Sequence, residues 1–550
     1  MNTLAAKDSL RALSAQTMSW PRAVAMGVFA ALTVAILLTF QDYGISWDEQ
    51  LQNTYGQKLL EYYTSGFEND GAFTYINLFL YGGAFDLAAA IANLISPFGE
   101  YETRHLLGGL VFLGGLYGAW KLTDLLAGER AALIALLCLA TTPLLYGHGF
   151  INPKDTPLAW AGIWTTYFAC RILAASGVNE RPSWGVIVGF AVSLGLTVGT
   201  RVIGLVYLDY LAGVFVVAAV ARSFGGEPVS IMWQRMRTNA VPLIVAVIIA
   251  AIVMALVWPW AVQEPFNMVA AFRSFAHFAF YPNVLWNGEL IPADQMPKNY
   301  LPGLLLLQLP EFVLLGLVIA AGVGVTALRR NILTLFAAPI SQQYLYVIVS
   351  FAVPILGYLV LHPTVYNGLR HFLFTVPPLV ILAAIGLERG LGFVLTKNRV
   401  AGLVLTAVLA FGFARQVVLM AGLHPYEYIA YNSIAGGVSG AQNRFELDYW
   451  GTTLAESARG LATYIAKDPT IGVTTGVTAK VFACGDRTSV EPFLPPGAAW
   501  TGLLSEADFY LGMTGVHCQE PIGRPYRTIF EVKRLGVTLG YAHDLRAAAN

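Results

Sequence analysis

Long apolar segments alternate with short polar loops along most of the chain. A stretch of roughly 17–25 mostly apolar residues is long enough to cross the hydrocarbon core of a bilayer as a helix. About eleven stretches qualify: residues 23–40, 104–125, 130–147, 156–175, 183–199, 202–221, 239–260, 303–326, 343–361, 372–388 and 398–420. The pattern predicts an all-α polytopic membrane domain with about eleven transmembrane helices and additional interfacial helices.

Two apolar stretches differ from a simple span. Residues 23–40 follow a basic segment, as in a signal peptide. They exceed the roughly 7–15 residues of a signal-peptide core and lack a small-x-small cleavage site, so we expect an uncleaved first span. Residues 76–96 are apolar but are interrupted by Gly82-Gly83 and Asp86. We expect them to form a helix that lies in the interface or re-enters the membrane from outside.

The composition supports a membrane protein. Hydrophobic residues make up 56% of the 550 residues and charged residues 12%, with a mean hydropathy of +0.60. Soluble domains carry about 25% charged residues. The 33 basic and 33 acidic residues cancel, and the sequence has no basic tail or stripe of the kind that nucleic acid requires. A nucleic-acid partner is therefore excluded.

Lys and Arg residues are unevenly distributed among the loops. If the N-terminus is cytoplasmic, fifteen of the 33 fall at inner ends and loops, eight on the outer face between residues 41 and 420, and ten after residue 420. Cytoplasmic loops collect Lys and Arg, so this orientation is favoured. An odd number of spans then places the C-terminus outside. We expect a cytoplasmic segment 1–22, a membrane domain 23–423 and a periplasmic α/β domain 424–550.

The C-terminal region has the pattern of a small α/β domain. Thr453 and Glu456 have the spacing of a capping box ahead of a helix. Strand-like runs follow at residues 470–477, 507–513 and 526–541. Cys484 and Cys518 would lie in an oxidising compartment, where they are able to pair. The other two cysteines, Cys138 and Cys170, fall inside predicted spans and are expected to be packing residues.

Four outer segments are rich in charged and aromatic residues: residues 40–62, "YGHGFINPKDTP" (146–157), "TRVIG" (200–204) and "LHPTVYNGLRHFLF" (361–374). Loops at one end of a helical bundle converge, so we expect their side chains to face one outward cavity. The candidate site residues in these segments are Asp48, Glu49, Tyr55, His148, Lys154, Asp155, Arg201, Tyr366, Arg370 and His371. Glu311, next to Pro310 in the eighth predicted span, is a further candidate because a charge within a span is costly and commonly functional.

Each signal alone has a simpler explanation. Asp48 and Glu49 suit the first turn of an interfacial helix that begins near Trp47. Asp155 suits an N-cap with Pro157 in the first helical turn, and the arginines suit anchors to lipid headgroups. No HExxH or CxxC spacing supports a metal site. The joint placement of carboxylates and cations on one outer face is the observation that favours a catalytic site.

This set of side chains suits an anionic, lipid-linked substrate such as a sugar joined to a polyprenyl phosphate. The phosphate is already a good leaving group, so little acid assistance is needed. Attack by an acceptor hydroxyl requires a carboxylate that takes its proton. The charge that develops on the phosphate requires fixed cations, preferably Arg. Both ingredients are present on the outer face.

These motifs resemble the glycosyltransferase C superfamily, and most closely the protein O-mannosyltransferases and the bacterial lipid A aminoarabinose transferases. The likeness covers about residues 25–420. The acidic pair in "SWDE" matches the start of the first outer loop of that family, "NPKD" matches a second acidic position, and "LRHFLFTVPP" resembles a stretch near the lipid phosphate. The resemblance implies that Asp48 is the base, that Asp155 is the second acidic residue and that Arg370 lies near the phosphate.

The resemblance implies an inverting glycosyltransferase in a bacterial inner membrane. It would take a sugar from an undecaprenyl- or decaprenyl-phosphate donor and transfer it to a lipid, glycan or protein acceptor outside the membrane. Glu49 would help to position the substrates or a cation, and Lys154 and Arg201 would support Arg370. Tyr55, His148, Tyr366, His371 and Glu311 would line the cavity. The lumenal sugar-binding modules of eukaryotic mannosyltransferases are missing, which counts against a protein acceptor.

Several alternatives stay open from sequence. Asp48 and Asp155 have hard oxygen ligands that suit a shared divalent cation, and nothing in the sequence requires one. Residues 431–451, which contain paired glycines and "DYWG", fit either a lid over the site or a structured linker. A transporter of lipid-linked sugars would show inverted repeats and polar groups at the membrane midplane, and we find neither. A non-catalytic assembly subunit would leave the carboxylates and arginines unexplained.

Overall fold

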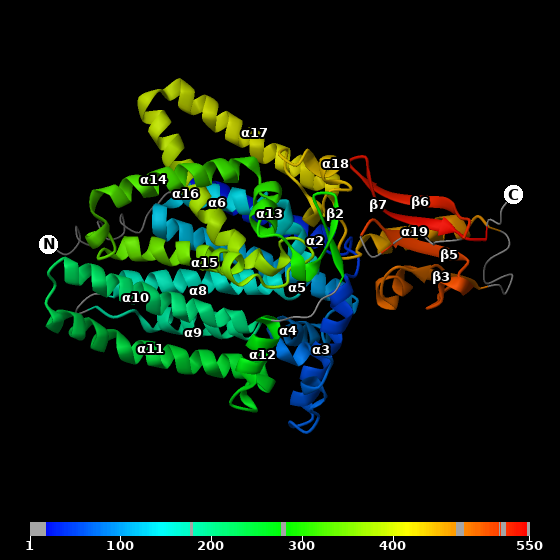
Figure 1. Cartoon of the computed structure of the whole chain (residues 1–550), viewed down its shortest axis with the longest axis horizontal. Coiled ribbons are helices and arrows are strands. Elements are labelled where there is room, and N and C mark those ends of the chain that lie inside the picture. Colours follow the sequence, from blue (N-terminus) through cyan, green and yellow to red (C-terminus); the bar gives the residue numbers. More distant parts are fainter. Residues whose placement is uncertain are drawn as a thin grey trace, which may run out of the picture.

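The computed structural model describes residues 18–176, 180–276, 282–468, 478–515, 518 and 524–546. A long bundle of helices forms most of the molecule, and a smaller sheet-containing unit lies at one end (Figure 1). An all-α bundle with a small α/β unit is the predicted fold class, and it is confirmed.

All eleven predicted spans fall on helices. Eight helices of the described chain are long and apolar enough to cross a membrane: α2 (Trp20–Thr39), α5 (Glu100–Ala127), α10 (Val206–Phe224), α11 (Val229–Val257), α14 (Glu311–Leu335), α15 (Pro339–Leu361), α16 (Val376–Lys397) and α17 (Arg399–Leu423). Their exposed surfaces are apolar, as a lipid-facing bundle requires.

The helices at the remaining three predicted spans are not among these eight, so the expected number of about eleven is not confirmed. One is a pair, α6 (Glu129–Ala140) and α7 (Pro143–Ile151), bent by 63°. Pro143 opens the second helix of the pair, where its missing N–H costs nothing. The others are α8 (Asp155–Ala175) and the short α9 (Trp184–Val198), which pack against each other.

Two helices lie outside the spans at the end that carries the sheet. They are α3 (Trp47–Thr64) and α4 (Ala84–Asn93), which pack together. The predicted interruption at Gly82-Gly83 is present, because a Cβ on Gly82 would lie 2.0 Å from the carbonyl oxygen of Gly199. Residues 84–93 form the helix expected in this stretch, and its location in the interface or as a re-entrant segment stays a prediction. Asp86 lies inside α4, 2% exposed, and accepts a 2.6 Å hydrogen bond from Arg104.

The other elements of the bundle end are short. They are α12 (Asn267–Ala276), the antiparallel pair β1 (Asn283–Trp286) and β2 (Glu289–Pro292), α13 (Tyr300–Gln308), the 3-10 helix η6 (Arg370–Thr375) and α18 (Gly437–Ala441). The predicted eighth span is divided between α13 and α14 at Leu309-Pro310. Because proline has no N–H and its ring clashes with the preceding turn, the helix ends there and restarts at Glu311.

The sheet unit packs one helix against a mixed five-stranded sheet. The helix is α19 (Thr453–Ile465), and the strand order is β4 (Ala498–Trp500), β3 (Ala479–Ala483), β5 (Phe509–Met513), β7 (Val537–Asp544) and β6 (Arg527–Arg534). β3 is parallel to β4 and β5, and β7 is antiparallel to β5 and β6. The strands expected at 507–513 and 526–541 are confirmed, the latter as a hairpin; 470–477 lies outside the described residues.

Residues 424–451 pack against the bundle. Tyr428, Ile429 and Tyr431 are at most 3% exposed and belong to the same apolar core as the spans. A separate core begins with Leu454 in α19 and continues through Phe509 in β5. The segment 424–451 therefore connects the last span to the sheet while lying along the bundle.

The capping box expected at Thr453 and Glu456 is wrong, because Asp448 takes that role. The Asp448 carboxylate is 0% exposed and accepts from the backbone N–H groups of Trp450, Gly451 and Thr453 at 2.8–3.2 Å. One side chain thereby satisfies the first N–H of α19 and two N–H groups of the loop before it. Glu456 is left free to contact other groups.

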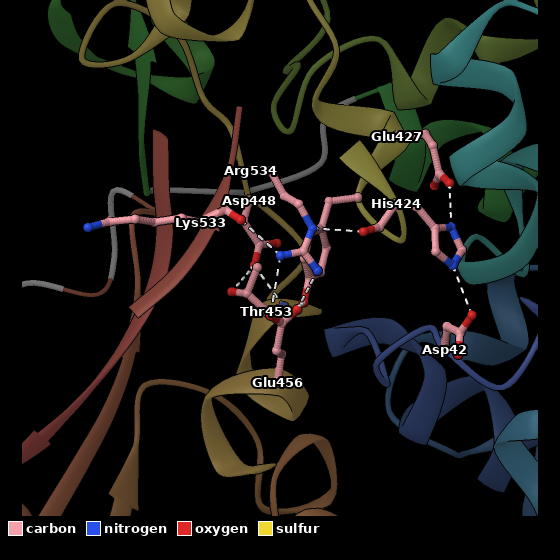
Figure 2. A network of polar contacts seen from close by, with 9 residues as sticks. Asp42, His424, Glu427, Asp448, Thr453, Glu456, Lys533 and Arg534 are labelled. Carbon is pink, nitrogen blue, oxygen red and sulfur yellow. Dashed lines mark hydrogen bonds and ion pairs between the residues drawn. The ribbon is translucent and has the colours of Figure 1, made fainter. Parts of the chain in front are cut away.

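A chain of polar contacts joins the sheet to the bundle (Figure 2). Arg534 in β6 contacts Glu456 at 2.6 Å and donates to the carbonyl oxygen of His424 at 2.7 Å. The His424 ring lies between Asp42 at 3.0 Å and Glu427 at 2.7 Å. The contacts run from β6 through α19 to the loop before α3, so they fix the sheet against the segment that leads into the first outer helix.

Cys484 and Cys518 form a disulfide, as the sequence predicts, and Cys138 and Cys170 are buried free thiols. A crosslink that closes a loop of 34 residues is worth about 3–4 kcal/mol by loss of denatured-state entropy. We expect the double variant Cys484→Ser/Cys518→Ser to lower the melting temperature of the sheet unit, measured as protease susceptibility during heating. Cys138→Ser is the control. Equal susceptibility of the double variant and the parent would contradict the prediction.

Candidate active site

The start of α3 fixes the position of the first acidic pair. Ser46 and Glu49 form a capping box, in which the Ser46 N–H donates to Glu49 at 2.7 Å. The Glu49 carboxylate is 1% exposed and also contacts His105 at 2.9 Å. The Trp47 N–H donates to the carbonyl oxygen of Trp450 at 3.2 Å. The Glu49 carboxylate therefore serves to cap the helix, and Asp48 is the carboxylate of the pair that can contact a substrate.

Asp48 holds two cations from distant parts of the chain. Its Oδ2 lies 3.0 Å from Lys154 Nζ and 3.1 Å from Arg370 NH1. The side chains of Lys154 and Arg370 are 10% and 9% exposed, whereas that of Asp48 is 24% exposed. One carboxylate oxygen therefore bridges the loop before α8 and the 3-10 helix before α16, and the carboxylate is open to solvent.

Aromatic rings flank the three cations of the site. Lys154 and Arg201 lie over the ring of Tyr81, at 4.9 and 5.4 Å from its centroid. Arg370 lies 4.8 Å from the Tyr366 ring and 5.1 Å from the Trp450 ring. The negative faces of these rings favour the charged side chains and hold them in place. The cations are held by the protein before any ligand arrives.

Asp155 forms a second carboxylate–cation pair beside the first. Its Oδ1 lies 2.8 Å from Arg201 NH2, and its Oδ2 accepts from Asn152 Nδ2 at 3.1 Å. Asn152 contacts His148, whose other ring nitrogen lies 3.0 Å from the hydroxyl of Tyr449. Asp155 is the first residue of α8 and Asn152 Oδ1 accepts its N–H, so the expectation that Asp155 is the N-cap is wrong.

The cluster of Asp48, Lys154, Asp155, Arg201 and Arg370 has an excess of positive charge. Three cations face two carboxylates, which leaves a formal charge of +1 at the end of the bundle that carries the sheet. Burial alone would raise the pKa of Asp48. The charges and hydrogen bonds of Lys154 and Arg370 outweigh burial and hold that pKa well below its usual range. Asp48 is ionised, and an additional anion is needed to balance the cluster.

The other predicted site residues lie around this cluster or away from it. Tyr55 is fully buried and donates to the Tyr81 carbonyl oxygen at 3.1 Å, behind the ring that supports the cations. The His371 ring packs edge-on against Tyr366, with centroids 4.6 Å apart. Glu311 is not brought to the cluster. It binds Ser433 at 2.8 Å and lies 3.4 Å from Arg415, so it ties the break between α13 and α14 to the segment 424–451.

Sequence reasoning missed Tyr81, Asn152, Tyr449 and Trp450 as parts of the site. Asn152 lies in the motif "NPKD" and Trp450 in the motif "DYWG". The motifs themselves were therefore the signal that could have identified these two residues. Tyr81 lies in the apolar stretch 76–96, where nothing in the sequence indicates a functional role. Glu446 was also missed: burial raises the pKa of its carboxyl to about 8, which favours the neutral form.

The residues present do not fit a divalent cation. Asp48 and Asp155 are the only ligands proposed for one, and each already faces a cation at 2.8–3.1 Å. Three positive side chains between them repel a divalent ion. Within the described ranges, no group of three or more His, Cys, Asp or Glu side chains has the arrangement of a metal site. The cluster is suited to an anion.

No protein-family model matches the sequence, and no curated protein matches it either. Several solved structures are similar. ArnT from Cupriavidus metallidurans, solved bound to undecaprenyl phosphate, shares 13% identity over 95% of this chain and 98% of that chain, with a TM-score of 0.47. The Archaeoglobus fulgidus oligosaccharyltransferase shares 12% over 90% and 70%, with a TM-score of 0.45. Arabinofuranosyltransferase AftD from Mycobacteria shares 13% over 95% and 40%, with a TM-score of 0.41.

The solved structures similar to this chain thus include an oligosaccharyltransferase and an arabinofuranosyltransferase. Similarity at this level carries no argument about the reaction, the substrate or the role of any residue. The function has to be argued from the geometry of the cluster itself.

The unbalanced charge of the cluster predicts how it binds a simple anion. Asp48→Asn removes the carboxylate that competes for Lys154 and Arg370, and a partly exposed ion pair is worth up to about 1 kcal/mol. We expect decyl phosphate to bind roughly fivefold more tightly to this variant, measured by calorimetry in detergent. Asp70→Asn is the control, because Asp70 is exposed and lies outside the cluster. Unchanged or weaker binding to Asp48→Asn would contradict the prediction.

Proposed function

We propose that the protein is an integral-membrane inverting glycosyltransferase that takes a sugar from a polyprenyl-phosphate donor. The observation that supports the proposal most strongly is the bridging of Lys154 and Arg370 by one partly exposed oxygen of Asp48. A base and a phosphate clamp are thereby placed within hydrogen-bond distance of each other. Undecaprenyl or decaprenyl phosphate is the donor carrier, and a lipid, glycan or protein on the outer side is the acceptor.

Donor binding is the first step. The donor phosphate takes Lys154 and Arg370 as its partners, and Arg201 supports it from the ring of Tyr81. Asp48 then loses the two cations that suppress its pKa and becomes a better proton acceptor. The resting ion pairs therefore keep the cations oriented and keep Asp48 deprotonated until the phosphate replaces it.

Sugar transfer is the second step. The acceptor hydroxyl oxygen forms a bond to the anomeric carbon as the bond from that carbon to the phosphate oxygen breaks. The hydroxyl proton goes to Asp48, and the bonding electrons leave with the polyprenyl phosphate. A single displacement from the face opposite the phosphate inverts the configuration. Asp155 is held between Arg201 and Asn152, where it orients Arg201 and the sugar.

The charges balance before and after the reaction. The cluster carries +1, and the phosphodiester of the donor carries one negative charge. After transfer, Asp48 is neutral and the cluster carries +2, while a phosphate monoester carries about −1.5 to −2 at pH 7. The developing charge on the leaving phosphate is therefore stabilised by the same proton transfer that activates the acceptor.

Other residues of the proposal act by positioning. Glu49 holds the start of α3 through Ser46 and His105, which sets the direction of Asp48. His148 and Tyr449 support Asn152 and Asp155. The proposal locates the cluster on the periplasmic side of a bacterial inner membrane, and the distribution of Lys and Arg favours a cytoplasmic N-terminus. Residues 431–451 contribute Trp450 to the clamp, which favours a role at the site over a simple linker.

Activity tests the assignment of Asp48. Purified protein with a radiolabelled polyprenyl-phosphate sugar and an envelope lipid extract as acceptor is expected to transfer label. Asp48→Asn is expected to transfer at least about 100-fold more slowly, because it lacks the proton acceptor, while binding the donor lipid at least as well as the parent. Asp70→Asn is the control, because Asp70 is exposed and lies outside the cluster. Parental activity in Asp48→Asn would overturn the assignment, and movement of intact donor across the bilayer would favour a transporter.

The pH dependence tests the exchange of partners. The fall of kcat/KM at low pH reports the pKa of Asp48 in the free enzyme, where Lys154 and Arg370 lower it. The fall of kcat at low pH reports the pKa of Asp48 in the donor complex. Because the phosphate removes both cations from Asp48, its pKa is higher in the complex. We expect kcat to fall at a higher pH than kcat/KM as the solution is acidified. A fall of both at the same pH would contradict the exchange.

A further inference from the structure

Two adjoining cavities lie along α11. The larger lies between α10 and α11, and the smaller lies between α11 and Arg181, which precedes α9. The connection from α10 to α11 lies at the end of the bundle opposite the sheet (Figure 1). Arg201 directly precedes the turn into α10, and Arg222 lies in its last turn. A helix of this length separates the two arginines by about 30 Å, the thickness of a bilayer core. These cavities therefore do not belong to the Asp48 cluster.

The larger cavity has a volume of about 440 Å³ and mostly apolar walls. Most of the lining residues on α11 have the i, i+3, i+4, i+7 spacing of one helix face: Val229, Met232, Trp233, Met236, Ala240 and Leu243. Phe215 and Val216 of α10 face this stripe. The walls suit a hydrocarbon chain.

The smaller cavity, of about 250 Å³, is lined by polar and basic residues and shares Trp233 with the larger one. Arg181 and Arg237 lie on its wall and form no ion pair within the described part of the chain. At the rim of the larger cavity, Arg222 and Arg235 share a single carboxylate, Glu227. Each of the two adjoining cavities is therefore lined by two guanidinium groups.

We infer that these cavities bind one anionic phospholipid of the cytoplasmic leaflet. The acyl chain fits the apolar cavity between α10 and α11, and the phosphodiester headgroup fits the basic cavity at Arg181 and Arg237. Trp233 is 55% exposed and lies where the two cavities meet, the position that tryptophan favours between apolar and polar surroundings. Basic cavities between membrane helices on the cytoplasmic side are suited to anionic headgroups. The inference is independent of the proposed transferase activity.

Binding of phosphatidylglycerol to the full-length protein in neutral detergent tests the inference. We expect the parent to bind this lipid at least tenfold more tightly than phosphatidylcholine. The double variant Arg181→Gln/Arg237→Gln is expected to bind it about 25-fold more weakly, about fivefold for each guanidinium near the surface. Lys397→Gln/Arg399→Gln is the matched control, because it removes two exposed cations at the connection between α16 and α17.

A second variant tests the chain cavity. Ala240→Phe fills the larger cavity without changing charge, and we expect it to weaken phosphatidylglycerol binding while the basic residues stay in place. Equal affinity for the two lipids, or equal losses in both double variants, would overturn the inference. Tighter binding of undecaprenyl phosphate than of phosphatidylglycerol, lost in Ala240→Phe, would also overturn it, because the occupant would then be the donor carrier.

Discussion

The function proposed for the protein depends on two ion pairs that one oxygen of Asp48 forms, with Lys154 and with Arg370. Lys154 and Arg370 reach it from segments more than 100 and 300 residues away, at 3.0 and 3.1 Å. Like charges at this distance repel each other, so the two cations are held together only while an anion lies between them. Asp48 supplies that anion in the resting protein, and a donor phosphate is suited to replace it.

The surrounding structure serves to keep this contact in place. The capping box at Ser46 and Glu49 fixes the start of α3, and the rings of Tyr81, Tyr366 and Trp450 hold the cations. Asp448 caps α19 immediately before Trp450 enters the site. The polar chain through His424 and Arg534 joins the sheet to the loop before α3 (Figure 2). The sheet unit therefore supports the site from its own side.

The sequence predicted the charged members of the site but not their supports. Apolar length located the helices, because a bilayer imposes a minimum length on each span. Carboxylates and cations in outer loops are rare enough to be noticed, which is how Asp48, Asp155 and Arg370 were found. The contact between Glu49 and His105 could not be predicted, because it depends on how α3 packs against α5. Tyr81 carried no signal, since an aromatic residue in an apolar stretch is ordinary until the fold places a cation over it.

The most direct measurement is an experimental structure of the full-length protein with a bound polyprenyl-phosphate sugar. The account predicts phosphate oxygens about 3 Å from Lys154 Nζ and from the Arg370 guanidinium, with the Asp48 carboxylate released and facing the anomeric carbon. A phosphate bound elsewhere, with Asp48 still joined to both cations, would contradict it.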